Sequence, residues 1–228
     1  MNLFSLEDKV ALVTGGKGLL APIWKETLEN AGAEVTMFDL PEYDVTSREQ
    51  LFEFAKTYTP DIIVNNAAID NPPTSKATFF GNAKEIIDVN LLGALNVCEV
   101  FIPKMIEKGG GVIVNIGSIQ GWLAADHRNY VGDFQKPFGY NASKWALRGL
   151  AKSITVQYGR YNIRCVTPSF SAYDGGKLDP VFLQKFLKNV PLNRCISKES
   201  MQMTLLYSVC CPELAGADWL VDAGYSCW

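Results

Sequence analysis

The sequence predicts an α/β fold built on one doubly wound parallel sheet with helices on both faces. Short apolar segments alternate with longer segments whose apolar residues recur at helical spacing, and this alternation runs through the whole chain. Strand and helix in alternation are typical of a parallel sheet covered by helices. Right-handed crossovers then wind the sheet in both directions, so we expect a Rossmann-type architecture.

The expected elements follow in order. Six short apolar segments predict buried strands at 9–14, 33–39, 61–67, 111–118, 162–169 and 218–224. Five amphipathic segments predict helices at 19–32, 47–58, 82–110, 139–160 and 197–209. Three of these helices are expected to end at glycine, the residue that helix C-termini favour: Gly32, Gly109 and Gly159. No linker or repeat divides residues 1–228, which we therefore expect to form a single domain.

The composition excludes several classes of protein. The chain has 228 residues, of which 48% are hydrophobic and 20% charged, as in ordinary globular domains. A net charge of −3 and the lack of a basic tract argue against nucleic acid and anionic membranes as partners. The first residues lack the pattern of a signal peptide, and no apolar run reaches the ~18 residues of a membrane span.

The cysteines and histidine argue against a metal site. Six cysteines are scattered without a C-x-x-C pair, and the chain has one histidine. Such cysteines are typical of reduced, mostly buried thiols, so we expect a cytoplasmic protein without a bound metal.

A glycine-rich turn, VTGGKGLLA, lies between the first strand and the first helix. Gly15 and Gly18 let the backbone turn tightly and approach a pyrophosphate, while the helix N-terminus offers free N–H groups. Ala21 is the small residue expected where this helix meets the strand. The turn therefore predicts a dinucleotide site, although an isolated glycine turn of this kind often has no ligand.

The expected cofactor is NAD(H), with NADP(H) as the alternative. Asp39 ends the second strand, where a carboxylate can accept a hydrogen bond from the adenosine ribose and repel a 2′-phosphate. Lys17 argues for NADP, because a cation in the glycine turn can meet that phosphate. We give Asp39 more weight because it lies at a strand end.

Seven ordered features then resemble the short-chain dehydrogenase/reductase family over essentially the whole chain. They are the Thr14-Gly15-Gly16-x-Gly18 turn, Asp44 in DVT, NNAA at 65–68, Asn90 in DVNLLG, Ser118, YNASK at 140–144, and the C-terminal PLNR and LVDAGY segments. Ala68, Ser169 and Ala223 stand where the family usually has glycine. The resemblance implies cofactor contacts at Gly15, Lys17, Gly18, Leu19, Asp39, Asp44, Asn66, Ala67, Tyr140 and Lys144.

Two Tyr-x-x-x-Lys pairs compete for the catalytic role. Tyr140 and Lys144 lie in an expected helix, where residues four apart share a face, whereas Asp-Gly-Gly between Tyr173 and Lys177 does not sustain a helical turn. Tyr140 is therefore the expected acid/base. An ammonium about 4 Å away is expected to lower the pKa of this phenol well below its usual value of about 10.

The family resemblance assigns roles to three further groups. It implies that Lys144 also holds the nicotinamide ribose, that Ser118 bonds the substrate oxygen and that Asn90 positions a water for proton relay. Taken singly, Ser118 is as well explained by a strand-end hydroxyl and Asn90 by a satisfied helix amide.

Two segments are expected to form the substrate side, at about 119–139 and 169–190. The first is longer than the family commonly has and contains Trp122, Asp126, His127, Arg128 and Tyr130. This mixture suits a hydroxylated substrate such as a sugar, although loop packing explains each residue alone. We expect His127 to be a loop hydrogen-bonder rather than a catalyst. The GLL turn, the insert and the terminal DAGYSCW are also similar to reductases of surface-glycan and flagellin-glycan pathways.

The sequence thus predicts an NAD(P)-dependent oxidoreductase that transfers a hydride between nicotinamide and an alcohol or carbonyl substrate. The alternatives are a nucleotide-sugar epimerase or dehydratase, and a dinucleotide-binding regulator without catalysis. Wide apolar stripes on the helices at 82–108 and 138–159 predict a homodimer or homotetramer.

Overall fold

The computed structural model describes residues 3–70, 82–132 and 134–227, and it has the predicted α/β architecture. All strand pairs are parallel, and the sheet runs in the order β2-β1-β3-β4-β6, with β5 and β7 also pairing with β6. The strands are β1 Val10–Thr14, β2 Glu34–Phe38, β3 Ile62–Asn65, β4 Gly111–Asn115, β5 Gly117–Ser118, β6 Ile163–Phe170 and β7 Asp218–Val221. Each of the six predicted strands is therefore confirmed.

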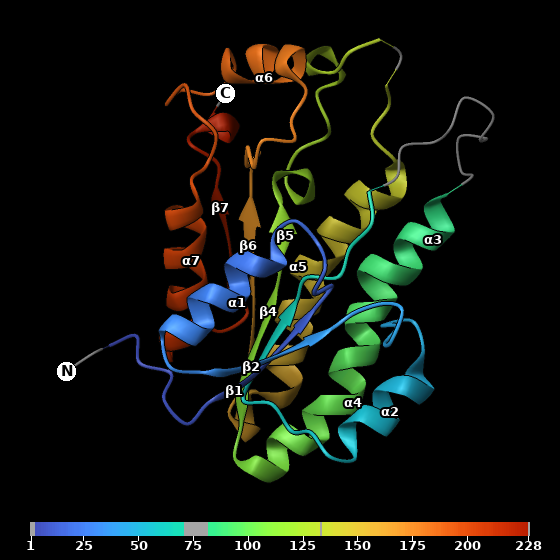
Figure 1. Ribbon diagram of the computed structural model, residues 1–228, viewed down its shortest axis with the longest axis vertical. Coiled ribbons are helices and arrows are strands. Elements are labelled where there is room, and N and C mark those ends of the chain that lie inside the picture. Colours follow the sequence, from blue (N-terminus) through green and yellow to red (C-terminus); the bar gives the residue numbers. More distant parts are fainter. Residues whose placement is uncertain (1–2, 71–81, 133, 228) are drawn as a thin grey trace.

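Helices cover both faces of this sheet, as Figure 1 shows. Their bounds are α1 Ala21–Asn30, α2 Arg48–Ala55, α3 Ala83–Ile87, α4 Gly93–Lys108, α5 Phe138–Tyr158, α6 Pro180–Leu187 and α7 Lys198–Cys210. One core lies between the sheet and α1 and α7, and a second lies between the sheet and α2, α4 and α5. In β1, Ala11 and Val13 belong to the first core and Leu12 to the second, which explains why this strand is a continuous apolar run.

The predicted strand at 111–118 is interrupted at Ile116, so it forms β4 and β5. The backbone N–H of Ile116 donates to Asn65, and its carbonyl accepts a hydrogen bond from the side chain of Lys144. The carbonyl of Ile116 thus accepts a hydrogen bond from Lys144 of α5 close to the end of the sheet, just before the loop that follows Ser118.

The long predicted helix at 82–110 has a π-helical turn, Asp88–Leu92, between α3 and α4. Insertions of this kind often occur at functional sites, and Asn90 lies within this one. By length and composition alone, the combined helix, Ala83–Lys108, is apolar enough to cross a membrane, although charged residues such as Asp88 and Glu99 interrupt its apolar run. However, Val97 and Phe101 are fully buried against the sheet, so packing in a protein core explains its apolar character.

The structure has the three predicted helix ends and adds a helix that the sequence analysis did not expect. Gly32 and Gly109 have φ of +104° and follow α1 and α4 as predicted. Gly159 is the C-cap of α5, as predicted, but its φ of −58° is right-handed and the chain continues into a 3-10 turn; Asn162, at φ +61°, is the left-handed residue that ends this turn. In addition, α6 lies inside the segment that was expected to be a loop.

Candidate active site

The glycine turn and the segment after β3 meet at the carboxyl edge of the sheet. Gly15 has φ of +67°, and a Cβ added there would lie 2.7 Å from Cα of Ala67. The backbone N–H of Gly18 donates to the carbonyl of Gly15 over 3.0 Å and closes the turn. Only glycine therefore fits at position 15 without strain or collision.

Asn66 holds this turn with its side chain. Its Nδ2 donates to the carbonyls of Thr14 (3.0 Å) and Gly15 (3.1 Å), and its Oδ1 accepts the indole N–H of Trp24 over 2.8 Å. Oγ1 of Thr14 in turn accepts the backbone N–H groups of Asn66 and Ala67. The NNAA segment thus shapes the turn through hydrogen bonds, and Trp24 is a member of the network that the sequence analysis missed.

Asp39 lies beside the turn, at the end of β2. Its carboxylate accepts the backbone N–H groups of Lys17 over 2.6 Å and of Leu40 over 2.7 Å. The side chain of Lys17 bends back to the carbonyl of Leu40 and to Glu42, at 3.0 Å. Lys17 therefore forms an ion pair with Glu42, in which both side chains are 63% exposed to solvent.

Two further predicted cofactor residues lie around this edge. Leu19 is 45% exposed at the end of the turn. Asp44 accepts both the N–H and the hydroxyl of Thr46 on one carboxylate oxygen, each over 2.8 Å. These residues lie at the same carboxyl edge as the glycine turn.

This edge fits a nicotinamide dinucleotide. A turn with glycine at 15, 16 and 18 brings bare backbone to the N-terminus of α1, where a pyrophosphate is stabilised by N–H groups and the helix dipole. Asp39 lies at the strand end where the adenosine ribose is bound in such sheets. When bound, the dinucleotide supplies or accepts the hydride, and the chain supplies its position and the proton.

Tyr140 and Lys144 lie one turn apart near the start of α5. Nζ of Lys144 donates to the carbonyl of Ile116 over 2.7 Å and lies 5.6 Å from the ring centre of Tyr140. The lysine is only 4% exposed. Burial lowers its pKa to about 8, and the positive charge of Lys136 adds to this, whereas Asp70 opposes it. Lys144 is therefore still mostly charged at pH 7.

The pKa of Tyr140 is raised, not lowered. Burial is the largest cause, the negative charge of Asp70 adds to it, and a hydrogen bond with Ser118 opposes it. The lowered pKa that the sequence analysis expected is therefore wrong for the chain alone, because desolvation of the phenolate outweighs the ammonium of Lys144. A neutral phenol at this place is a proton donor.

Ser118 and Asn90 surround this pair. Oγ of Ser118 accepts the N–H of Gln120 over 3.1 Å. The side chain of Asn90 donates to the carbonyl of Ile69 (3.0 Å) and to Ser143 of α5 (3.3 Å), and it accepts the N–H of Ile69 over 2.8 Å. Asn90 thus ties the segment after β3 to α5, and its role in a water relay remains a prediction.

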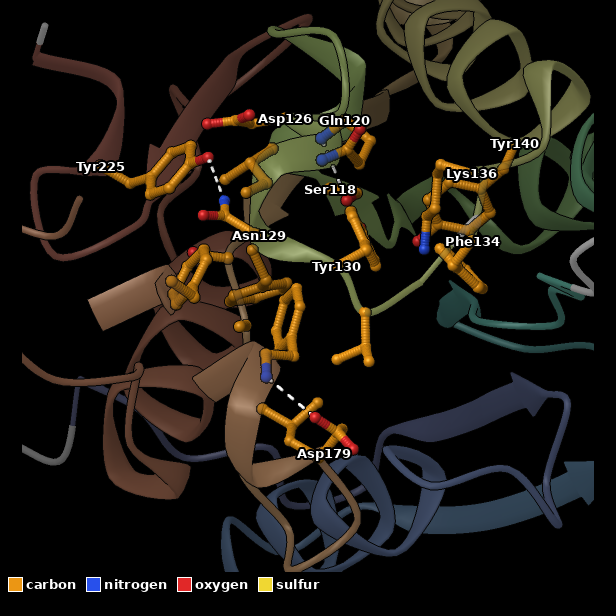
Figure 2. A pocket seen from close by; sticks show the side chains of 18 of the residues that line it. Ser118, Gln120, Asp126, Asn129, Tyr130, Phe134, Lys136, Tyr140, Asp179 and Tyr225 are labelled. Atoms are coloured by element: carbon orange, nitrogen blue, oxygen red, sulfur yellow. Dashed lines mark hydrogen bonds between the residues drawn. The ribbon is translucent and has the colours of Figure 1, made fainter. Parts of the chain in front are cut away.

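A cavity of about 460 Å³ opens beside Ser118 and Tyr140. Both segments that the sequence predicts for the substrate side contribute to its lining, and Figure 2 shows Ser118, Lys136 and Tyr140 among the side chains around it. One wall is a continuous row of aromatic rings with neighbouring centres 4.6 to 5.6 Å apart, formed by Phe134, Tyr130, Phe182, Phe186 and Tyr225.

Most of the residues singled out in the insert bond within the protein. His127 accepts the backbone N–H of Lys136 over 3.3 Å, so it is a loop hydrogen-bonder as predicted. Asp126 pairs with Arg128 over 2.8 Å. The ring of Trp122 lies under the guanidinium of Arg148, 3.6 Å from its centre, and packs on α5.

The competing pair does not form a catalytic couple. Tyr173 forms an isolated bridge with Ile196, and the residues that follow it are bends rather than a helix, as predicted. Lys177 reaches the rim of the cavity, whereas the ring of Tyr173 packs against the core beneath α1.

The sequence analysis missed three polar residues that line the cavity, Asn129, Lys136 and Tyr225, and the acid that pairs with one of them, Asp70. Lys136 pairs with Asp70, and Asn129 donates to the hydroxyl of Tyr225 over 3.1 Å. Both pairs join segments far apart in the chain, so neither has a local sequence signal. Only the position of Lys136, four residues before Tyr140 in an extra-long insert, pointed toward the site.

Comparison with known proteins assigns this arrangement. The family model described as short chain dehydrogenase matches residues 2–172. The chain belongs to the short-chain dehydrogenase family. Carbonyl reductase family member 4 of Xenopus tropicalis is 30% identical over 209 residues, which cover 87% of this chain and 83% of that protein.

Solved structures agree in fold. A short-chain dehydrogenase from Leptospira borgpetersenii with bound NAD+ superposes with a TM-score of 0.86 at 24% identity, covering 98% of this chain and 95% of that one. A gluconate 5-dehydrogenase from Burkholderia cenocepacia, in complex with NADP and tartrate, gives a TM-score of 0.82 at 22% identity, covering 99% and 98%. As a short-chain dehydrogenase, this chain is an NAD(P)-dependent oxidoreductase of alcohol or carbonyl groups. Its resemblance to glycan-pathway reductases remains a prediction.

Proposed function

We propose that this short-chain dehydrogenase interconverts a carbonyl and an alcohol at Tyr140, with NAD(H) as its preferred cofactor. In the reducing direction the carbonyl carbon gains a hydride from the nicotinamide, and its oxygen gains the proton of the Tyr140 hydroxyl. The single observation that supports this best is the position of Tyr140. Its phenol lines the cavity beside Ser118, and Lys144 lies one helical turn away.

The other groups have supporting roles in this proposal. Ser118 orients the substrate oxygen, and Lys144, charged at neutral pH, holds the nicotinamide ribose. Asn90 acts mainly as a positioning residue, because its side chain is bonded to Ile69 and Ser143. The segments at 119–139 and 169–190 enclose the substrate.

The preference for NAD(H) rests on two acids. Asp39 lies where the adenosine ribose is bound, and Glu42 pairs with the one cation of the glycine turn, Lys17. A 2′-phosphate here would approach two carboxylates, Asp39 and Glu42, and a single lysine. Negative charge at this place favours a free ribose hydroxyl over a phosphate.

The experiment is a cofactor-consumption assay with the full chain. NADH and NADPH oxidation are followed with a panel of ketones, aldehydes and oxo acids, and binding of both cofactors is measured by fluorescence. We expect turnover with NADH above that with NADPH. Tight cofactor binding without turnover on any carbonyl would instead support a regulator, and higher turnover with NADPH would overturn the cofactor preference.

We also propose a homodimer or homotetramer. On the helices at 82–108 and 138–159, the side chains of Leu92, Leu95 and Trp145 are 43%, 37% and 50% exposed. By contrast, Val97 and Phe101 on the first of these helices are buried. Exposed apolar side chains on adjacent helices are typical of subunit contacts. Light scattering at micromolar concentration tests this, and a mass of 25.2 kDa would reject it.

The cytoplasm is the proposed compartment. Cys98 and Cys165 are buried free thiols, and the other four cysteines are free as well, which suits a reducing environment. Cell fractionation checks this.

A further inference from the structure

A second lysine lies at the reacting end of the cavity. Nζ of Lys136 is 4.5 Å from the ring centre of Tyr140, and its side chain is only 14% exposed. It forms an ion pair with Asp70. Lys136 therefore holds a positive charge within the cavity wall, next to the proposed proton donor (Figure 2).

Lys136 and Asp70 are both anchored close to the catalytic helix. The backbone N–H of Lys136 donates to His127, and α5 begins two residues further on. Asp70 directly follows Ile69, which Asn90 holds with two hydrogen bonds. An ammonium has three N–H donors, and Asp70 occupies one of them. The charge is thus held in place with donors to spare for a ligand.

The acids of the cavity lining are already engaged. Asp126 pairs with Arg128 over 2.8 Å, and Asp179 accepts the backbone N–H groups of Val181 and Phe182 at the start of α6. Asp70 is therefore the acid that competes with a ligand for Lys136. These pairings leave the reacting end of the cavity suited to an anion.

The rest of the cavity suits an apolar group. The aromatic row from Phe134 to Tyr225 forms one wall. The exception is Oγ of Ser171, a cavity-lining hydroxyl that is buried without a hydrogen-bond partner among the described residues and could bond one polar group of a ligand. A sugar with many hydroxyls would find most polar groups here bonded to one another, whereas a flat apolar group would lie on the rings.

We propose that Lys136 binds the carboxylate of a 2-oxo or 2-hydroxy acid whose remainder is aromatic or otherwise apolar. The carboxylate at Lys136 would place the adjacent carbon, which carries the reacting oxygen, against Tyr140 and Ser118. Asp70 holds the ammonium in position and shares it with the substrate. This inference rests on the proposed function and names the substrate class of the same site.

The test compares an acid with its neutral ester. Benzoylformate and methyl benzoylformate share the aromatic ring and the 2-oxo group, and each is reduced with saturating NADH. The ratio of kcat/KM for acid to ester is measured for wild type, Lys136→Met, Lys136→Arg and Asp70→Asn. Because both compounds use Tyr140, any change in its pKa cancels in the ratio.

The expected results differ in sign. Lys136→Met lowers the ratio at least about tenfold, as expected for a lost charge-assisted hydrogen bond, and Lys136→Arg retains most of it. Asp70→Asn raises the ratio, because it removes the competing acid. Lys177→Met is the matched control, since Lys177 is an exposed lysine at the rim of the same cavity and its loss should change the ratio less than about threefold.

Four outcomes overturn the inference, and a fifth overturns the proposed function as well. An unchanged acid-to-ester ratio in Lys136→Met shows that the ion pair between Lys136 and Asp70 only connects two loops and binds no substrate. If Asp70→Asn lowers the acid-to-ester ratio as much as Lys136→Met does, the ion pair likewise has only a structural role. A larger loss in Lys177→Met places the anion at the rim. If neither compound is reduced while another carbonyl is, the substrate class is wrong and the proposed function stands; if no carbonyl is reduced, the proposed function itself fails.

Discussion

Polar side chains at the cofactor edge bond mainly to the backbone, whereas those at the substrate cavity bond largely to one another. Asn66 holds the carbonyls of Thr14 and Gly15 at the cofactor edge. At the cavity, Lys136 pairs with Asp70. Backbone-directed bonds fix the course of the chain, while pairs between side chains can be replaced without moving the sheet. The cofactor edge is thus rigid by construction, and the cavity is the part that can be adapted to a substrate.

The largest effect on NADH affinity is expected at the cofactor edge. Gly15→Val puts a branched side chain at φ +67° and a Cβ 2.7 Å from Ala67. The free variant can relax this strain, which is on the order of 2 kcal/mol, by moving the turn. Because NADH binding must then restore the strained turn, NADH affinity should fall about thirtyfold. Fluorescence titration with NADH measures this.

Gly18→Ala is the control for that change. A Cβ at Gly18 would lie 3.1 Å from the carbonyl oxygen of Gly15, and no left-handed φ is required there. The loss of affinity should therefore be clearly smaller than at position 15. Equal losses would show that the cofactor does not depend on the close approach of Gly15 to Ala67.

A smaller effect is expected at Asp39. Asp39→Ala should weaken NADH binding about tenfold, because the ribose loses a charged hydrogen-bond acceptor. The variant should also bind NADPH better relative to NADH than the wild type does. Asp39→Asn separates the two roles, since it removes the charge but retains an acceptor. The ratio of the Kd values for NADH and NADPH checks this, and a wild-type preference for NADPH would contradict it.

The pH dependence of carbonyl reduction should follow the protonation of Lys144, which lies between the cofactor edge and the substrate cavity. With a pKa of about 8, Lys144 is mostly charged at pH 7 and mostly neutral at pH 9. The raised pKa of Tyr140 keeps the phenol protonated over this range. The kcat/KM for NADH in carbonyl reduction, which reflects the free enzyme, should therefore be level near pH 7 and fall up to about tenfold by pH 9. An increase over this range would contradict the assignment.

The smallest effect is expected at Lys17. Since Glu42 balances its charge, Lys17→Met should change the preference between NADH and NADPH less than about threefold. Glu42→Gln frees the lysine and should improve NADPH binding instead. A large loss of NADPH binding in Lys17→Met alone would mean that the lysine meets the cofactor directly.

The features that the sequence predicted correctly are those that depend on local chain geometry. The six predicted strands were found because each is a short, mainly apolar run; β1, β3 and β4 are buried along nearly their whole length, whereas β2 and β7 are partly exposed. The positions of Gly15 and Tyr140 follow from local chain geometry. Local patterns also indicated that Tyr173 and Lys177 do not share a helix. The helix α6 was missed, although Asp179 and Pro180 are a typical helix start, because Gly175 and Gly176 shortly before it are typical of a loop.

The rest depended on contacts between distant segments. Asn129 meets Tyr225 across 96 positions, and Lys136 meets Asp70 across 66. The direction of the Tyr140 pKa shift also required the structure, since the spacing of Tyr140 and Lys144 shows the attraction but not the burial that outweighs it.

The central claim is that the two regions meet at Tyr140, and one paired measurement tests it most directly. NADH affinity and turnover on a carbonyl substrate are measured for Tyr140→Phe and Tyr173→Phe. We expect Tyr140→Phe to bind NADH nearly as wild type while turnover falls at least about a hundredfold, as for loss of a general acid, and Tyr173→Phe to lose much less. Small and equal losses of turnover in both variants would contradict the account.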